Sequence, residues 1–226
     1  MSDTALLLES VLREQPSGAA WCERALPGGA PLSMLAFRTS YAAASRRLGS
    51  SAALQVTPPA ALRDVARPHW ALVDYARVLL LTRALAELPT QAHSAFIVAV
   101  LEGGEIGEQE SLLRTLALVP DCERFESIGV SACRTNAVRV FEAIACENAY
   151  PAQHFREPGF NQMVLKAIFL GVPLSRIEGL AARNTPELQR MARGYGSERL
   201  AAGRSVPEDV RLILSASSEP LAGDLP

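Results

Sequence analysis

The single lysine of the chain, Lys166, is the first residue that could perform chemistry. It lies in the nearly apolar run FNQMVLKAIFL, which begins at Phe160 and has the pattern of a helix. An amine among apolar side chains loses hydration, which lowers its pKa and suits it to Schiff-base or general-base catalysis. The structural alternative is a lysine whose stem packs on Phe169 while its ammonium pairs with a carboxylate. Because few lysines are catalytic, we favour the structural interpretation.

Asn161 and Gln162 are the only other polar side chains of this run. Gln162 and Lys166 lie one helical turn apart, so the polar strip of the expected helix is narrow. A helix that is apolar around most of its circumference should be packed on more than one side. We therefore predict a buried central helix over residues 159–171, with Asn161, Gln162 and Lys166 as candidate ligand-binding residues.

The proline-bounded linker before this helix carries His154, with Glu157 nearby. Histidine exchanges protons near neutral pH, and loops held by a rigid scaffold often carry functional side chains. A structural hydrogen-bonding role is the simpler alternative for a lone loop histidine. The other two histidines, His69 and His93, are isolated in the sequence, so no metal site is predicted.

Three further polar residues are candidates for contacts with a ligand. Asn136 stands beside Thr135 near the start of an expected helix, where it could equally be a cap. Tyr195 and Arg199 are one turn apart on the last long helix and should share a face. Taken singly, each of them is explained just as well by a solvated surface.

Motifs of common catalytic and cofactor sites are missing from the sequence, which has no GxSxG, HExxH or P-loop pattern. Gly103, Gly104 and Gly107 follow an expected helix rather than a strand, which argues against a phosphate-binding loop. The acidic stretch 102–110 is expected to face solvent. The four cysteines show no CxxC spacing, so reduced structural thiols are expected. The sequence thus predicts no cofactor.

The composition is that of a globular protein, with 226 residues, 49% of them hydrophobic and 20% charged. The net charge of −2 excludes a polybasic surface for nucleic acid or anionic membranes. The N-terminus lacks a basic region followed by an apolar run, and no uncharged stretch is long enough to cross a bilayer. We expect a cytoplasmic protein that does not insert into the membrane itself.

Helical periodicity and helix-ending residues recur along the chain, whereas no run of alternating strands with hairpin turns occurs. The predicted fold class is therefore all-α. Helices of about a dozen residues alternate with short loops after Thr90, which is typical of stacked antiparallel helical hairpins, HEAT-like or α-solenoid-like. The longer helices are expected at 33–48, 68–88, 90–103, 107–118, 121–132, 134–147, 159–171, 185–202 and 207–214.

We predict one all-helical domain over residues 1–214. Within it, residues 1–48 form N-terminal helices, 49–58 are a candidate hinge, and 59–214 form the main helical body. Residues 215–226 are expected to be a disordered tail.

The second half of the chain resembles a known family. The likeness rests on FNQMVLKA at 160–167 and ERLAAGR at 198–204, together with Tyr150-Pro151 and Arg183-Asn184. Over residues 134–207 the chain is similar to the EboA family of metabolite traffic proteins. A weaker likeness covers the helix that contains Pro68-His69-Trp70.

The resemblance implies a place in a pathway rather than a reaction. Members of the family are encoded in bacterial operons with a UbiA-like membrane prenyltransferase, and these operons are associated with moving small-molecule precursors toward the periplasm. For this chain the resemblance implies secondary metabolism. We predict a non-catalytic binding or adaptor component, because the sequence has no nucleophile, metal or cofactor motif and its helical pattern is suited to presenting grooves. It would be cytoplasmic, and peripheral to the inner membrane only through a partner.

The partners implied by the resemblance are a small-molecule metabolite and other operon products, including the UbiA-like prenyltransferase, with no nucleic acid. The alternative function is an enzyme that acts on a pathway intermediate. In that case Lys166 would be the amine catalyst and His154 the acid or base.

Overall fold

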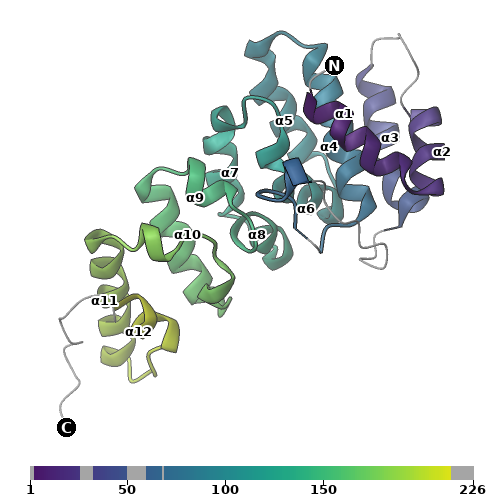
Figure 1. The fold of residues 1–226 in the computed structure, drawn as a ribbon. Coiled ribbons are helices and arrows are strands. Elements are labelled where there is room, and N and C mark those ends of the chain that lie inside the picture. Colours follow the sequence, from purple (N-terminus) through teal and green to yellow (C-terminus); the bar gives the residue numbers. More distant parts are fainter. Residues whose placement is uncertain (1–2, 26–32, 50–59, 68, 215–226) are drawn as a thin grey trace. The chain divides into compact units, whose positions relative to one another are not determined.

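The computed structural model describes residues 3–25, 33–49, 60–67 and 69–214, and every regular element in these ranges is a helix. The all-α prediction is therefore confirmed for the described part of the chain (Figure 1). The chain divides into two compact units, Met1–Ile144 and Ala145–Pro226, called unit 1 and unit 2 below. The division falls inside a helix rather than at the candidate hinge.

Unit 1 contains α1 to α7 and most of α8. Their bounds are α1 (Asp3–Arg13), α2 (Pro16–Ala25), α3 (Met34–Leu48), α4 (Leu72–Ala86), α5 (His93–Glu102), α6 (Ile106–Arg114), α7 (Glu126–Ala132) and α8 (Val138–Ala145). Short 3-10 turns lie at Ala60–Leu62, Thr90–Ala92, Leu116–Leu118 and Cys122–Phe125.

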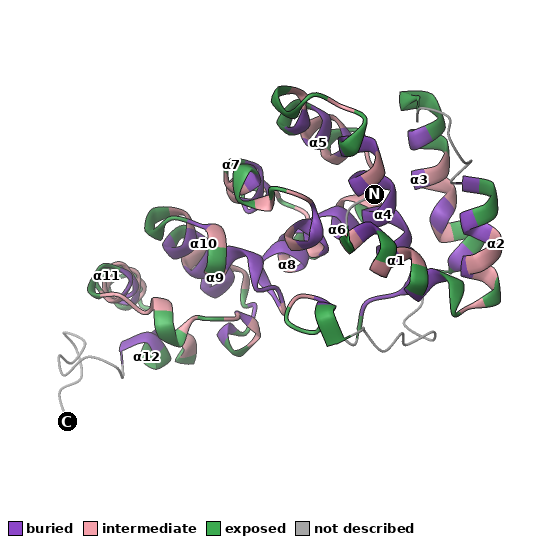
Figure 2. Ribbon diagram, turned by 45° about the horizontal axis from the view of Figure 1, so that its top comes forward, coloured by how far each residue is buried: buried purple, intermediate pink, exposed green. Residues whose placement is uncertain are grey.

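The core of unit 1 is built around α4. All of its residues except Arg83 and Ala86 are buried, and it packs against α1, α3 and α6 (Figure 2). This helix is rich in leucine and valine on all sides, so it can bury its whole circumference only among several neighbours. The helix enclosed on all sides is therefore α4, and not the one predicted at 159–171.

Two buried charged residues of α4 join it to neighbouring helices. Asp74 accepts a 2.6 Å hydrogen bond from the Ser111 hydroxyl and pairs with Arg114 at 3.1 Å, both on α6. Arg77 donates to the backbone oxygens of Tyr41 (3.1 Å) and Gly107 (2.8 Å). Because a buried charge is tolerated only when it is well paired, these bonds hold α3 and α6 at defined positions on α4.

Unit 2 contains α9 (Tyr150–His154), α10 (Glu157–Leu170), α11 (Pro186–Ala201) and α12 (Glu208–Leu214). Helix α10 packs on α11, and α11 packs on α12. The segment around Tyr150 and Pro151, expected as a linker, is the short helix α9. Proline is compatible with the first turn of a helix, where its missing N–H would have had no partner in any case.

Helix α10 confirms the position of the predicted 159–171 helix but not its complete enclosure. Val164 and Ile168 are buried, as expected. Gln162 is exposed, and Phe169, seven residues later, is 73% exposed. Exposed residues at i and i+7 belong to one stripe, so α10 is a one-sided helix whose outer face includes an aromatic ring.

Arg183 connects the elements of unit 2. Its guanidinium donates to the backbone oxygens of Ala152 (2.6 Å) and Phe155 (2.7 Å), and it lies 4.6 Å from the centre of the Phe160 ring. These contacts use the planar fork of arginine, which lysine could not reproduce. They attach the turn before α11 to the end of α9 and the start of α10.

Some predictions fall outside the described residues. They include the disordered tail at 215–226 and, apart from Gly49, the candidate hinge at 49–58. The prediction of one domain over residues 1–214 also stays a prediction.

Candidate functional site

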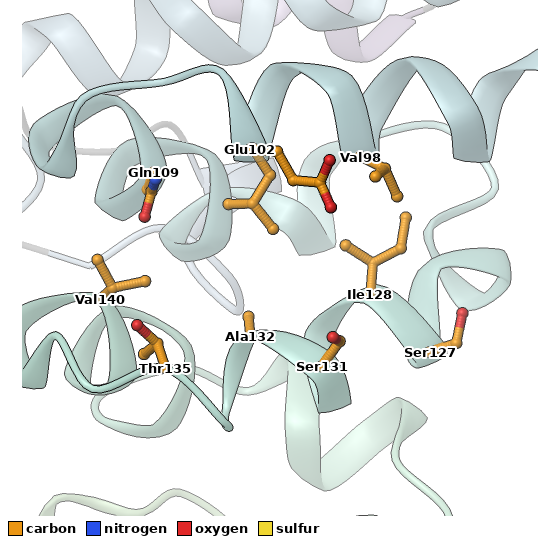
Figure 3. A pocket seen from close by; sticks show the side chains of 10 residues that line it. Val98, Glu102, Gln109, Ser127, Ile128, Ser131, Ala132, Thr135 and Val140 are labelled. Atoms are coloured by element: carbon orange, nitrogen blue, oxygen red, sulfur yellow. The ribbon is translucent and has the colours of Figure 1, made fainter.

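A cavity of about 320 Å³ lies within unit 1, between α5 and α6 on one side and α7 and α8 on the other (Figure 3). We call it the α5–α8 cavity. Its residues are Val98, Leu101, Glu102, Gln109, Ser127, Ile128, Ser131, Ala132, Thr135 and Val140. Four of them, from α5 and α6, form one wall, and the other six form the facing wall.

The apolar part of the lining comes from both walls. Val98 of α5 faces Ile128 of α7, and Val140 of α8 lies at the other end of the cavity, near Gln109 (Figure 3). Leu101 of α5 and Ala132 of α7 also line it. Small-molecule sites are usually concave, largely apolar and between roughly 300 and 1,000 Å³, so the cavity has the size of a site for a small metabolite. These aliphatic side chains offer dispersion contacts to any apolar ligand, whatever its detailed structure.

Gln109 contributes a hydrogen-bond acceptor to the cavity. Its Nε2 donates to the backbone oxygen of Gly104 at 2.9 Å, which sets the orientation of the amide. The Oε1 atom is then the atom of this side chain left to accept, and Figure 3 shows it turned toward the facing wall. The cavity therefore has an acceptor whose direction is fixed by the backbone.

Glu102 brings a negative charge to the cavity. It is the last residue of α5 and is exposed, and among the described residues its carboxylate has no hydrogen bond or ion pair. The carbonyl end of a helix carries a partial negative charge, so α5 adds to the potential at this point. None of the described lining residues is cationic, so the cavity is an acceptor-rich, negatively charged environment.

The facing wall supplies three hydroxyl groups, from Ser127, Ser131 and Thr135 (Figure 3). The Thr135 hydroxyl already accepts the Ala137 N–H at 3.1 Å. A serine hydroxyl can rotate to donate or accept, so this wall adapts to a ligand more readily than the amide of Gln109.

Ion pairs join α6, one of the helices around the cavity, to α8 and to α4. Glu110 of α6 is only 8% exposed and pairs with Arg139 of α8 at 2.7 Å. Helix α6 is also bonded through Ser111 and Arg114 to Asp74 of α4. A binding site is most precise when rigid elements carry its side chains, and α6 is secured to two helices here.

None of the seven predicted site residues is among the residues given above as the lining of this cavity. Asn136 is exposed in the loop before α8. Its neighbour Thr135 lines the cavity, and the Thr135 hydroxyl accepts the backbone N–H of Ala137. The other six predicted residues, His154, Asn161, Gln162, Lys166, Tyr195 and Arg199, belong to unit 2.

Within unit 2, Tyr195 and Arg199 do share a face of α11, as predicted. An Arg199 Nη donates to the Tyr195 hydroxyl at 3.4 Å, and the guanidinium lies 5.9 Å from the ring centre. The Nε of Arg199 also donates to the backbone oxygen of Ser205 at 2.7 Å. Through these bonds, Arg199 holds the chain that follows α11. A ligand-binding role for Tyr195 and Arg199 stays a prediction.

Two unit 2 candidates have distinct surroundings. The ring of His154 lies 4.7 Å from that of Tyr150, so a structural contact accounts for its position. Asn161 is 1% exposed, and in the described part of the chain neither amide atom has a hydrogen-bond partner. Leaving a buried polar group unpaired costs about 1–3 kcal/mol, which makes Asn161 the unit 2 candidate with the clearest unmet bonding capacity.

Gln162 is exposed and Lys166 is half-buried on α10. The pairing of Lys166 with a carboxylate, and its participation in a site, both stay predictions.

The sequence did not indicate the α5–α8 cavity. The acidic stretch 102–110 was expected to face solvent, and this is wrong for Glu110, which is buried against Arg139, and incomplete for Gln109, which lines the cavity. No local pattern could have shown this, because the facing wall comes from residues 127–140. The glycines at 103 and 104 mark only the turn between α5 and α6.

Among the described residues, no group of three or more His, Cys, Asp and Glu side chains could hold a metal ion. None of the helices in the described ranges combines the length and the apolar character needed to span a bilayer.

Nearly the whole chain matches a known protein family. The family model described as "Metabolite traffic protein EboA" matches residues 23–214. The chain belongs to the EboA family. The EboA match extends well beyond the resemblance at 134–207 and includes every residue of the α5–α8 cavity. No curated protein and no solved structure matches the chain.

Proposed function

We propose that this EboA family member is a non-catalytic binding component of a metabolite traffic system, and that it holds a small metabolite in the α5–α8 cavity. The observation that supports the proposal is the cavity of about 320 Å³ with aliphatic walls and a few oriented polar groups. This combination is typical of small-molecule sites. The family description supplies the metabolite traffic.

The polar groups of the cavity suit binding better than catalysis. A serine hydroxyl becomes a nucleophile when a base such as histidine or lysine removes its proton. Among the described lining residues, Ser127 and Ser131 have no such partner. A carrier benefits from this arrangement, because it must release its ligand unchanged.

The route and the partners are further parts of the proposal. A secondary-metabolite precursor would be carried toward the periplasm, with the protein cytoplasmic and at the inner membrane only through a UbiA-like prenyltransferase or another operon product. Co-purification of the chain with the separately expressed proteins encoded beside its gene is the direct test. If none of these proteins is retained, the adaptor role is contradicted, whereas the proposed ligand site is not.

We also infer that the helices are stacked as antiparallel hairpins, HEAT-like or α-solenoid-like. Helices that follow one another in the chain pack together, as helical hairpins require. The pairs are α1–α2, α2–α3, α3–α4 and α5–α6 within unit 1 and α11–α12 within unit 2. An experimental structure in which successive pairs do not stack in parallel layers would contradict this inference.

The ligand site is tested by filling the cavity. Ile128→Trp places a large ring between the walls, while Ile106→Trp makes the same change at an exposed position of α6 outside the lining. We would titrate both variants with 2-cyclohexylethylamine, 2-cyclohexylethanol and cyclohexylacetate, and follow binding by saturation-transfer NMR and calorimetry. Ligands of this size bind with affinities of about millimolar at best.

The expected result is binding of at least one probe to the native protein and to Ile106→Trp, with binding lost in Ile128→Trp. Binding that survives in Ile128→Trp, or no binding of any probe to the native protein, would refute the proposed site.

A further inference from the structure

The geometry points to Gln109 as the residue that sets the ligand class of the α5–α8 cavity: a neutral, apolar molecule whose O–H or N–H group donates a hydrogen bond to Gln109 Oε1. This inference rests on the proposed function and deepens it by naming the class of ligand. It follows from the bonds that hold Gln109 in the free protein and from the charge of the lining.

The direction of the Gln109 amide is fixed by the turn between α5 and α6. Its Nε2 donates to the backbone oxygen of Gly104 at 2.9 Å. A backbone oxygen can only accept a hydrogen bond, so the amide atom that faces it must be the nitrogen. The amide oxygen is turned toward the facing wall (Figure 3). A ligand in the cavity therefore meets a hydrogen-bond acceptor at this position.

The segment that carries Gln109 is also held through its backbone and its neighbour. The backbone N–H of Gln109 donates to the Glu105 oxygen at 2.9 Å. The next residue, Glu110, pairs with Arg139 of α8 at 2.7 Å. A side chain that is already ordered loses little conformational entropy when a ligand binds, so more of its hydrogen bond is available as affinity.

The other polar oxygens of the lining are less suited to select a ligand. Glu102, Ser127 and Ser131 are exposed, so water competes with a ligand for their oxygens. The Thr135 hydroxyl already accepts the Ala137 N–H at 3.1 Å. Gln109 is half-buried, and its amide is therefore the fixed acceptor that water reaches least freely.

Aliphatic side chains lie near this acceptor and at the far end of the cavity. Val140, which is 2% exposed, lies near Gln109, and Val98 faces Ile128 at the other end (Figure 3). A hydrogen bond is stronger where water is excluded, so the buried Val140 favours a donor at this point. The apolar body of the same ligand can then extend toward Val98 and Ile128.

The charge of the lining disfavours ionic ligands at Gln109. None of the described lining residues is cationic, so a carboxylate or phosphate would lose hydration here without gaining a counter-charge. An ammonium at Gln109 would lie away from the Glu102 carboxylate, which Figure 3 places at the opposite end, and would be desolvated in the same way. A ligand with acceptors only would displace water from Oε1 and leave it unpaired.

The test compares four probes that share a six-membered carbon ring: cyclohexanol, cyclohexanone, cyclohexylamine and cyclohexanecarboxylate. The alcohol and the ketone have nearly the same size, but only the alcohol donates a hydrogen bond. Saturation-transfer NMR titrations at about pH 7, where the amine and the acid are both charged, give the dissociation constants. We expect the native protein to bind cyclohexanol more tightly than either charged probe.

Gln109→Met assigns the hydrogen bond to its residue, because methionine keeps the length of the side chain and lacks the amide oxygen. The variant should bind cyclohexanol about three- to tenfold more weakly than the native protein, and cyclohexanone within about twofold of the native value. Gln91→Met makes the same change at an exposed residue outside the lining and should alter neither dissociation constant. Circular dichroism checks that the helices of both variants are unchanged.

A measurement on the native protein is independent of the variants. With isotope-labelled protein, the side-chain amide resonances of Gln109 should shift when cyclohexanol is added, and those of Gln91 should not. An unchanged Gln109 amide at a saturating concentration of cyclohexanol would overturn the inference.

The outcomes separate the inference from the proposed function. If Ile128→Trp blocks binding but Gln109→Met weakens cyclohexanol no more than cyclohexanone, the cavity is a metabolite site and the assignment of a donor to Gln109 is overturned. Tighter binding of cyclohexylamine or cyclohexanecarboxylate than of cyclohexanol overturns the neutral class. If neither these probes nor the longer cyclohexyl probes bind the native protein, both the site and its ligand class are refuted.

Discussion

Asp74→Ala is expected to lower the free energy of unfolding of unit 1 by about 3 to 4 kcal/mol. Asp74 is 1% exposed near the start of α4, and its carboxylate accepts from three groups. They are the Ala71 backbone N–H at 2.9 Å, the Ser111 hydroxyl at 2.6 Å, and an Arg114 Nη at 3.1 and 3.2 Å. One side chain thus caps α4 and joins it to α6.

The magnitude follows from what the substitution leaves behind. Removing one partner of a buried ion pair typically costs about 3–5 kcal/mol, because the remaining charge has no counter-charge. The Arg114 side chain is 25% exposed and can be partly hydrated, which places the effect toward the lower end. Losing the helix cap adds about 1 kcal/mol. Some of these losses overlap, so they do not add in full.

The assay is urea denaturation followed by tryptophan fluorescence. The chain has two tryptophans, Trp21 and Trp70, and both lie in unit 1, so the signal reports this unit alone. Asp64→Ala is the matched control, because Asp64 is exposed and no described group bonds to its carboxylate. It should change stability by less than about 0.5 kcal/mol.

A loss below about 1 kcal/mol for Asp74→Ala, with an unchanged denaturant slope, would refute the reasoning. It would mean that the bonds of Asp74 are replaced by water at little cost, and that α6 is held to α4 mainly by apolar packing. In that case the rigidity of the α5–α6 wall would need another explanation.

Three further predictions concern other parts of the chain. Burial opposes the shift, but the hydrogen bond from Arg13 and the charges of Arg83 and Arg13 lower the pKa of Glu9 below its ordinary 4.5. The stability lost in Glu9→Gln should therefore be full at about pH 7 and shrink in urea titrations as the pH falls below 4.5 through this lowered pKa, and a loss that grows on acidification would contradict this. Gly179→Ala should destabilise unit 2 by about 2 kcal/mol or more, because φ at Gly179 is +71° and the new Cβ would lie 2.6 Å from the Cβ of Ala152. Thermal unfolding followed by circular dichroism measures this, and an unchanged melting temperature would refute it. Burial raises the pKa of the Cys22 thiol, so mass spectrometry should show it alkylated far more slowly at about pH 8 than in the urea-unfolded chain, and equal rates would contradict this.

Local sequence signals were sufficient for the longer helices and several of their ends, although not for the short helix α9. Ser33 accepts the Ala36 N–H at the start of α3, and Gly49 follows its last residue. Thr185 likewise accepts the Leu188 N–H, with Pro186 in the first turn of α11. Caps act within three or four residues, so the chain carries this information locally. The same holds for the shared face of Tyr195 and Arg199, since side chains one turn apart on a helix must be neighbours.

Burial and the candidate site were decided by the tertiary structure. Helix α10 is as apolar as a core helix, yet Phe169 faces solvent, while α4 with its buried Asp74 and Arg77 is the enclosed helix. The apolar pattern of a helix indicates which of its residues can be buried. Whether a residue is buried, and whether a buried charge has a counter-charge, depends on the neighbouring helices that pack on it. The α5–α8 cavity has the same origin. Glu102 and Gln109 acquire a role only because residues 127–140, from later helices, form the opposite wall, and no spacing within 102–110 encodes that arrangement.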